Sequence, residues 1–149
     1  MKVAVASDHG GVPLNEEVIA ELRGLGHEVV DLGTHDAGNG DDYPDHAEDL
    51  GRRLVRGEFE RGVLICGSGV GASVAANKIH GVRAGLCHDT YSAHQGVEHD
   101  DCNVLCLGAR VVGREVALEL VRAFVNARFS GEERHRRRLE KVLALERKG

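Results

Sequence analysis

A cysteine that ends an apolar run and is followed by a glycine-rich stretch is the strongest chemical signal in the sequence. The segment reads Ile65-Cys66-Gly67-Ser68-Gly69-Val70-Gly71-Ala72. Glycines let backbone N–H groups approach a ligand closely, and the start of a following helix favours an anion or a developing oxyanion. That helix start would also lower the pKa of the Cys66 thiol. The alternative is a turn that only packs a helix on a strand.

A dinucleotide site is a second interpretation of the glycines. Asp89 lies 22 residues beyond Gly67, near where a ribose-binding acid would stand. The pattern is nevertheless G-x-G-x-G rather than G-x-G-x-x-G, it follows the third predicted strand, and no second half of a doubly wound fold follows. We therefore predict that the chain needs no NAD and no other cofactor.

Asp8 and His9 stand at the end of the first predicted strand, in the sequence Ser7-Asp8-His9-Gly10-Gly11. A carboxylate and an imidazole at the carboxyl end of a strand suit the recognition of a polar substrate. A helix N-cap and a turn would use the same residue types. The residues alone leave both interpretations open.

Histidines raise the question of a metal. Four of the nine lie within twenty residues: His80, His88, His94 and His99. No pair of them has the H-x-x-x-H spacing that places two ligands on one helix face, and no cysteine is suitably spaced. We predict that the chain has no metal site.

The densest basic cluster is Arg134-His135-Arg136-Arg137-Arg138. Charge runs of this kind are commonly solvated helix faces. Arg134 and Arg138 are nevertheless four residues apart and share one face of a helix, where they suit a phosphate. Arg110, just after the fifth predicted strand, could join them.

Composition limits the class of partner. The chain has 149 residues, a formal net charge of -5 and only 3% aromatic residues. Residues 128–149 hold eight basic and four acidic residues, so a basic tail follows an acidic body. The acidic body and the few aromatic side chains argue against nucleic-acid binding. The sequence shows neither a signal peptide nor a membrane-length apolar run, and its four cysteines form no C-x-x-C pair, so we expect a cytoplasmic protein with reduced thiols.

Strands and helices are predicted to alternate along the chain. The predicted strands are 2–7, 28–32, 62–66, 82–87 and 104–107. The predicted helices are 13–24, 44–56, 72–79, 90–99, 113–129 and 132–147. This order predicts an α/β fold in which residues 1–149 form one Rossmann-like domain, a parallel five-stranded sheet with helices on both faces. The last helix has a narrow apolar stripe and a basic polar face, so we expect it to pack on a partner subunit.

These segments together resemble the ribose-5-phosphate isomerase B group of the ribose/galactose phosphate isomerase family. The resemblance rests on motifs that run in family order along nearly the whole chain: Ser7-Asp8-His9-Gly10-Gly11, Asp42-Tyr43-Pro44, Cys66 to Gly71, Ala75-Ala76-Asn77-Lys78, Tyr91-Ser92-Ala93, His99 to Leu105, Gly108-Ala109-Arg110-Val111-Val112-Gly113, and Arg134-His135-x-x-Arg138. The resemblance implies aldose–ketose isomerisation of a phosphosugar through a cis-enediolate without a metal.

The resemblance also implies a role for each residue. Cys66 would be the general base between C1 and C2, because Ala72 stands where some members have a glutamate, and His99 would open the furanose ring. Backbone N–H groups of Gly67, Gly69, Val70 and Gly71 would stabilise the enediolate, and Ser68 would relay a proton between its oxygens. The remaining predicted contacts are Asp8 and His9 with the sugar or its phosphate, Tyr43 with the substrate as a lining residue, and Arg110, Arg134, His135 and Arg138 with the phosphate.

One departure from the family concerns the substrate. Asp100 follows His99 where the family usually has asparagine, and an ionised carboxylate accepts but does not donate hydrogen bonds. Ribose 5-phosphate is the expected substrate, with a tetrulose 4-phosphate or a hexose 6-phosphate as alternatives, and a non-catalytic sugar-phosphate sensor as a third. The family's site lies between subunits, so the resemblance implies a homodimer or a dimer of dimers. We expect no nucleic-acid or membrane partner.

Overall fold

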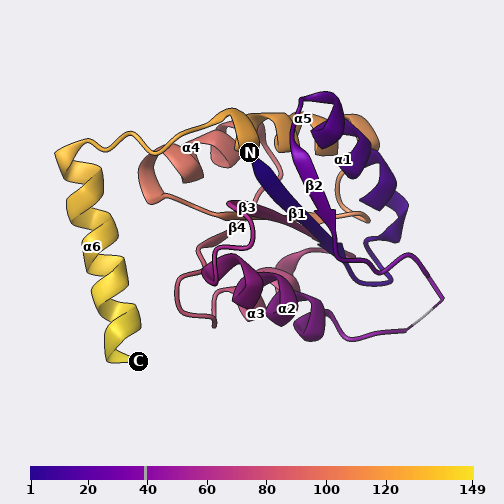
Figure 1. Cartoon of the computed structure of the whole chain (residues 1–149), viewed down its shortest axis with the longest axis horizontal. Coiled ribbons are helices and arrows are strands. Elements are labelled where there is room, and N and C mark those ends of the chain that lie inside the picture. The colour runs from indigo at the N-terminus through magenta and orange to yellow at the C-terminus, as the bar shows by residue number, and fades with distance from the viewer. Residues whose placement is uncertain (39) are drawn as a thin grey trace.

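The computed structural model describes residues 1–38 and 40–149, which form one α/β domain around a five-stranded parallel sheet (Figure 1). The strands are β1 (Lys2–Ser7), β2 (Glu28–Asp31), β3 (Arg61–Cys66), β4 (Ala84–Leu86) and β5 (Val104–Gly108). The helices are α1 (Val12–Gly24), α2 (Tyr43–Val55), α3 (Val70–Ala76), α4 (Thr90–Asp100), α5 (Arg114–Asn126) and α6 (Glu133–Lys148). The predicted Rossmann-like α/β fold is confirmed, and the packing of the last helix on a partner subunit stays a prediction.

Strand order places the site. The sheet runs β2-β1-β3-β5-β4, so the chain steps outward from β1 to β2 and then returns to add β3 on the other side of β1. In register, Ser7 of β1 lies opposite Ile65 of β3. Ligands of open parallel sheets bind beyond the carboxyl ends of strands where the winding reverses, and here those ends carry Asp8 and Cys66.

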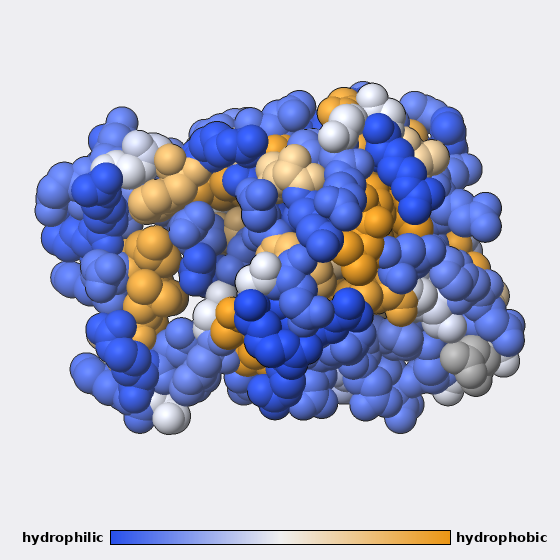
Figure 2. Space-filling view, in the orientation of Figure 1, coloured by the Kyte–Doolittle hydropathy of each residue, from blue (hydrophilic) through white to orange (hydrophobic). Residues whose placement is uncertain are grey.

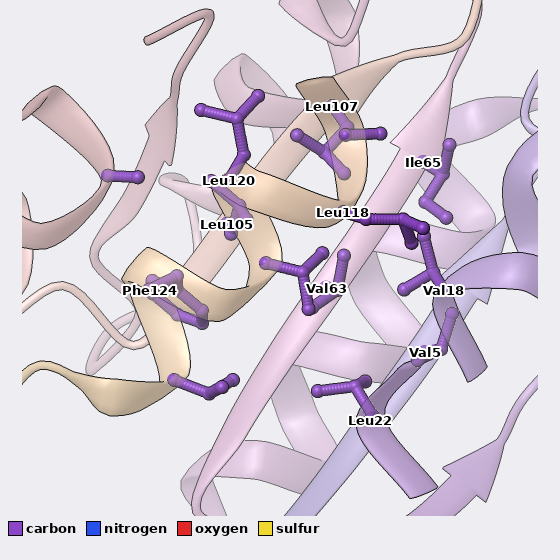
Figure 3. Close-up of a cluster of buried hydrophobic side chains, with 14 of the residues drawn as sticks. Val5, Val18, Leu22, Val63, Ile65, Leu105, Leu107, Leu118, Leu120 and Phe124 are labelled. Carbon is purple, nitrogen blue, oxygen red and sulfur yellow. The ribbon is translucent and has the colours of Figure 1, made fainter. Parts of the chain in front are cut away.

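Helices cover both faces of the sheet, and each face has its own core. On one face α1, α4 and α5 pack on strand residues such as Val5, Val63 and Leu105, all of them almost fully buried (Figures 1 and 3). On the other face α2 and α3 pack on Ala4, Leu64 and Cys106. Alternate residues of β1, β3 and β5 point to opposite faces. Because both faces are covered by helices, nearly every position is buried and these strands are continuous apolar runs in the sequence.

The bounds differ most from the prediction at α3, predicted as 72–79, and at α5, predicted as 113–129 and ending at Asn126. Strand β4, predicted as 82–87, is shorter at both ends. Gly69 adopts a left-handed conformation (φ +81), so the helix begins at Val70, directly after it. The Asn77 side chain then donates to the Ala84 carbonyl at 3.0 Å and accepts from the Ala84 N–H at 2.8 Å. These two hydrogen bonds explain why α3 ends at Ala76 and β4 begins only at Ala84.

Helix α6 stands apart from the rest of the domain at the left of Figure 1. Its apolar side chains face the body across a groove of about 760 Å³, whose lining includes Leu139, Val142, Leu143 and Val82 (Figure 2). Near the end of α6, Glu146 accepts the Gly81 N–H at 2.9 Å and ties the helix to the body. None of the helices formed by residues 1–38 and 40–149 is long and apolar enough to span a membrane.

Candidate functional site

Two loops touch at the carboxyl edge of the sheet, one after β1 and one after β3. A Cβ added at Gly10 would lie 2.9 Å from the Gly67 nitrogen, and one added at Gly11 would lie 2.1 Å from the Ile65 carbonyl oxygen. Only glycine fits such approaches. The loops that the sequence singled out separately therefore form one surface.

Cys66 and Asp8 lie together at the centre of this surface, each only 6% exposed. Burial raises the pKa of the Cys66 thiol, and the charge and hydrogen bond of the Asp8 carboxylate raise it further. Backbone N–H groups of Gly69 and Gly67 lower that pKa, but by less. The expectation of a lowered pKa was wrong: α3 is only seven residues long, and desolvation and a neighbouring anion outweigh its N-terminus.

The loop that follows Cys66 is fixed by its own contacts. The Ser68 hydroxyl accepts the Val70 N–H at 3.2 Å. The Ser68 carbonyl lies so close to β5 that a Cβ at Gly108 would approach its oxygen to 2.4 Å. Ser68 is exposed, two residues after the buried Cys66.

Tyr43 and Arg110 complete the same surface from different elements. The Tyr43 ring at the start of α2 packs so closely on Gly71 that a Cβ there would lie 2.6 Å from the ring. The Arg110 guanidinium lies over Gly67, 3.6 Å from where its Cβ would be. We refer to Asp8, His9, Tyr43, Cys66, residues 67–71 and Arg110 as the Cys66 cluster.

A second set of predicted residues gathers around the end of α4 and the start of α6. The rings of His99 and His135 stack with centroids 4.0 Å apart and planes at 25°. Gln95 lies 2.9 Å from Nδ1 of His99, and the Ser130 hydroxyl donates to or accepts from Nδ1 of the buried His135. We refer to His99, Asp100, Arg134, His135 and Arg138 as the His99 cluster.

The charged members of the His99 cluster differ in their partners. Burial lowers the pKa of His135, and the neighbouring His99 and Arg134 lower it further. Arg134 pairs with Glu132 at 2.9 Å. Asp100 and Arg138 are exposed, and Asp100 also lines the groove beneath α6.

The two clusters lie at opposite edges of the sheet. Cys66 ends β3, whereas α4 runs antiparallel to the strands, so His99 lies close to where Asn103 contacts the beginnings of β3 and β4. A strand of six residues separates these edges by about 16–20 Å. Within one chain, Cys66 therefore does not meet His99, and Arg110 does not meet Arg134 or Arg138.

Sequence reasoning missed two residues beside the Cys66 cluster. Asp41 accepts from the His9 ring at 2.9 Å and also contacts the His46 ring. Nothing in the residue types singled out His46, and Asp41 lies in a stretch rich in Gly and Asp. The only available signal was their proximity to Tyr43 in the sequence.

Among residues 1–38 and 40–149, no group of three or more His, Cys, Asp or Glu side chains is arranged to hold a metal ion. Of the four clustered histidines, His94 pairs with Glu98 at 2.9 Å, and His80 lies beside a shallow pocket with Arg52 and Lys78. The donor groups are dispersed over the surface, and the expectation of a metal-free site stays a prediction.

Comparisons with known proteins show which family the chain belongs to. Residues 3–142 match the Ribose/Galactose Isomerase family. The chain is 43% identical over 145 residues to ribose-5-phosphate isomerase B of Escherichia coli, covering 97% of this chain and 96% of that protein. It is 37% identical over 131 residues to a D-erythrulose-4-phosphate isomerase of Pectobacterium atrosepticum, covering 88% of this chain and 86% of the relative.

A solved structure is similar over the same length. The ribose-5-phosphate isomerase B of Clostridium thermocellum superposes with a TM-score of 0.95 at 43% identity, covering 99% of both chains. Profile, sequence and three-dimensional likeness thus span the whole domain, including both clusters. This chain belongs to the ribose/galactose isomerase family.

Proposed function

We propose that this chain interconverts ribose 5-phosphate and ribulose 5-phosphate. Its relatives include ribose-5-phosphate isomerases, and such an aldose–ketose isomerase needs a base beside groups that stabilise an enediolate. The observation that carries the proposal is the Cys66 thiol, held between the Asp8 carboxylate and the N–H groups of Gly67 and Gly69.

Cys66 acts as the general base in this proposal. Its thiolate removes a proton from C2 of the aldose and returns it to C1 through a cis-enediolate. N–H groups of residues 67–71 stabilise the enediolate oxygens, and the exposed Ser68 hydroxyl relays a proton between them. Because burial and Asp8 raise the pKa of the thiol, little thiolate is present at neutral pH. We expect kcat to rise with pH as the thiolate fraction grows.

Ring opening and phosphate binding need the His99 cluster, which lies at the other edge of the sheet. In the proposal His99 protonates the ring oxygen, and Arg134, His135 and Arg138 bind the phosphate together with Arg110. Within one chain these groups and Cys66 lie at opposite edges of the sheet. In the proposal a second copy of the chain therefore supplies them. The minimal unit is therefore a homodimer with two sites, and α6, which begins at the His99 cluster, packs on the partner.

A panel of aldose phosphates tests the substrate. Purified protein is assayed with ribose 5-phosphate, tetrose 4-phosphates and hexose 6-phosphates, and kcat/KM is compared. We expect ribose 5-phosphate to give the highest value. Turnover of another phosphosugar hundreds of times faster would reject the ribose assignment and leave the isomerase assignment intact.

A tetrulose 4-phosphate is the second candidate substrate, because Asp100 beside His99 changes the group presented to the sugar. The similarity to a D-erythrulose-4-phosphate isomerase supports the same alternative. An Asp100→Asn variant separates the two candidates. If Asp100 selects a shorter sugar, the variant shifts the ratio of kcat/KM values towards ribose 5-phosphate.

A non-catalytic sugar-phosphate sensor is the alternative outside enzymes. A sensor needs no base, whereas the chain has Cys66 buried beside N–H donors. Exchange of the C2 hydrogen of bound substrate with solvent distinguishes the two, since only an enzyme promotes it. Activity that EDTA leaves unchanged would support metal independence, and a loss restored specifically by zinc would contradict it.

A further inference from the structure

A chain of hydrogen bonds outside the sheet joins helix α2 to the Cys66 cluster. The Asp41 carboxylate accepts from the His9 backbone N–H at 2.8 Å, and one of its oxygens lies 2.9 Å from Nδ1 of His9. Its second oxygen contacts Nε2 of His46. The side chains of Asp41 and His46 are 15% and 20% exposed and that of His9 is 37% exposed, so water competes least for the contact between Asp41 and His46.

Asp41 is ionised in this arrangement. Burial acts to raise the pKa of its carboxyl group, but the hydrogen bonds from His9 and His46 outweigh burial and hold that pKa at about 2. An ionised carboxylate only accepts hydrogen bonds, so both imidazoles must donate to it. His9 therefore carries a proton on Nδ1, and His46 carries one on Nε2.

Fixing the Nδ1 proton of His9 leaves Nε2 for a ligand. Nε2 of His9 has no hydrogen-bond partner among residues 1–38 and 40–149. The hydrogen bond to Asp41 raises the pKa of His9 against a smaller effect of desolvation, and the charge of Asp8 raises it further. His9 thus stays an imidazolium to higher pH, with an Nε2–H that can donate to an anionic oxygen.

His9 lies at the rim of the Cys66 cluster. It is flanked by Asp8, whose carboxylate accepts the Gly10 and Gly11 N–H groups at 2.9 and 3.1 Å, and by Gly10, which touches the Gly67 loop. The main chain on both sides of His9 is therefore fixed. The orientation of the His9 ring is then the remaining degree of freedom, and the contact with Asp41 restricts it.

His46 supplies the anchor for Asp41. Asp41 lies in the connection between β2 and α2, which is outside regular structure, whereas His46 is on α2. That helix is held by the buried Ala47 and Leu50. A carboxylate bound from two sides loses its rotational freedom, as in sites where a ligand is oriented by a second contact.

We propose that His46 is a positioning residue for substrate binding: through Asp41 it fixes the His9 imidazole so that Nε2–H meets an oxygen of the sugar phosphate. This inference rests on the proposed function for its substrate, but the His9 orientation does not depend on it. The charges of Asp8 and Asp41 both favour the imidazolium form of His9. Two further acidic residues, Asp42 and Asp45, precede His46 along the chain.

Nitrogen NMR of histidine-labelled protein tests the orientation directly. The His9 signals are assigned from their loss in His9→Gln. Spectra are recorded above the pKa of His9, where the ring is neutral and carries a single proton. We expect wild-type His9 to keep that proton on Nδ1, and His46→Phe to populate both tautomers. His46→Gln keeps a donor near the position of Nε2 and should restore the wild-type pattern. His94→Phe, which removes another histidine–carboxylate pair, is the matched control and should leave His9 unchanged.

Kinetics provide the second measurement. We expect His46→Phe to raise KM about tenfold, the loss of one charge-assisted hydrogen bond, with kcat within twofold, and His46→Gln to restore KM. Asp41→Asn removes the charge that raises the pKa of His9, so KM should begin to rise with pH at a lower pH than in the wild type.

Two results would overturn the inference: a His9 spectrum unchanged in His46→Phe, or an altered spectrum with an unchanged KM. If the wild-type protein isomerises no sugar phosphate, the proposed function fails. In that case the spectra still decide whether His46 positions His9, and the dissociation constant of ribose 5-phosphate replaces KM.

Discussion

The Asp8 carboxylate lies beside the Cys66 thiol and raises its pKa beyond the effect of burial. The same carboxylate accepts two N–H groups of the following turn, so its position is fixed by the backbone and not by the thiol. The base of the proposed reaction is thus restrained by a neighbour of the same charge.

Asp8→Asn should therefore make Cys66 more reactive. Removing the charge lowers the pKa of the thiol, so more thiolate is present at pH 7, and alkylation by iodoacetamide should accelerate about three- to tenfold. Asparagine still accepts the two N–H groups, so the turn is retained. Peptide mass spectrometry follows Cys66 separately from Cys102, whose pKa burial raises to about 12 and which serves as the internal control. An unchanged rate at Cys66 would show that Asp8 does not restrain it.

Mixing two inactive variants tests whether the site is shared between copies. Cys66→Ser and His99→Gln are each expected to be inactive as pure proteins. In a mixed dimer, one site carries both substitutions and the other carries neither. Statistical reassembly of equal amounts gives half mixed dimers, so about a quarter of wild-type activity should return. No recovery after verified subunit exchange would place the whole site within one chain.

Arg134→Ala should raise KM for the phosphosugar by roughly tenfold or more, which corresponds to loss of a hydrogen bond to a charged group. Arg136→Ala removes the same charge from the same helix and is the matched control, because Arg136 approaches Gly131 rather than the His99 stack. The two variants are compared at equal ionic strength. Equal effects would mean that the helix acts through its general charge and not through a phosphate contact at Arg134.

Gly11→Ala should destabilise the fold at the contact between the two loops. The added Cβ would lie 2.1 Å from the Ile65 carbonyl oxygen, in backbone that has little room to move, so we expect a loss of about 3 kcal/mol. Gly24→Ala is the control, because it meets nothing within 4 Å and ends helix α1. It should be neutral or stabilising by up to about 1 kcal/mol. Urea denaturation measures both, and similar midpoints would contradict the close contact.

The fold could be predicted from the sequence because its signals are local. Apolar runs of strand length, each closed by polar residues or glycine and followed by a helical pattern, specify alternating elements, and parallel pairing follows from that alternation. The predicted bounds of α3 and β4 were wrong because a side-chain contact sets where these elements end and begin. The Asn77 side chain bonds to the Ala84 backbone across the turn. Periodicity does not report such a contact.

The site could be predicted by residue but not by charge state or orientation. The motifs identified Cys66 and Asp8 separately, and only the structure brings them together. Their contact reverses the expected direction of the thiol pKa. Asp41 and His46 carried no periodic or motif signal, because their importance arises from a single hydrogen-bonded path to His9.

Helix α4 runs from the carboxyl edge of the sheet to the opposite edge, where it places His99. It begins with Asp89 capping Ser92 near the end of β4 and delivers His99 against His135 one turn before β5. Each residue of a helix advances the direction of a side chain by about 100°. One inserted or deleted residue within α4 would thus turn His99 away from His135 without touching either ring. The length of this helix is constrained as tightly as the identity of the residues it carries, whereas the connection between β2 and α2 can vary in length wherever Asp41 keeps its place.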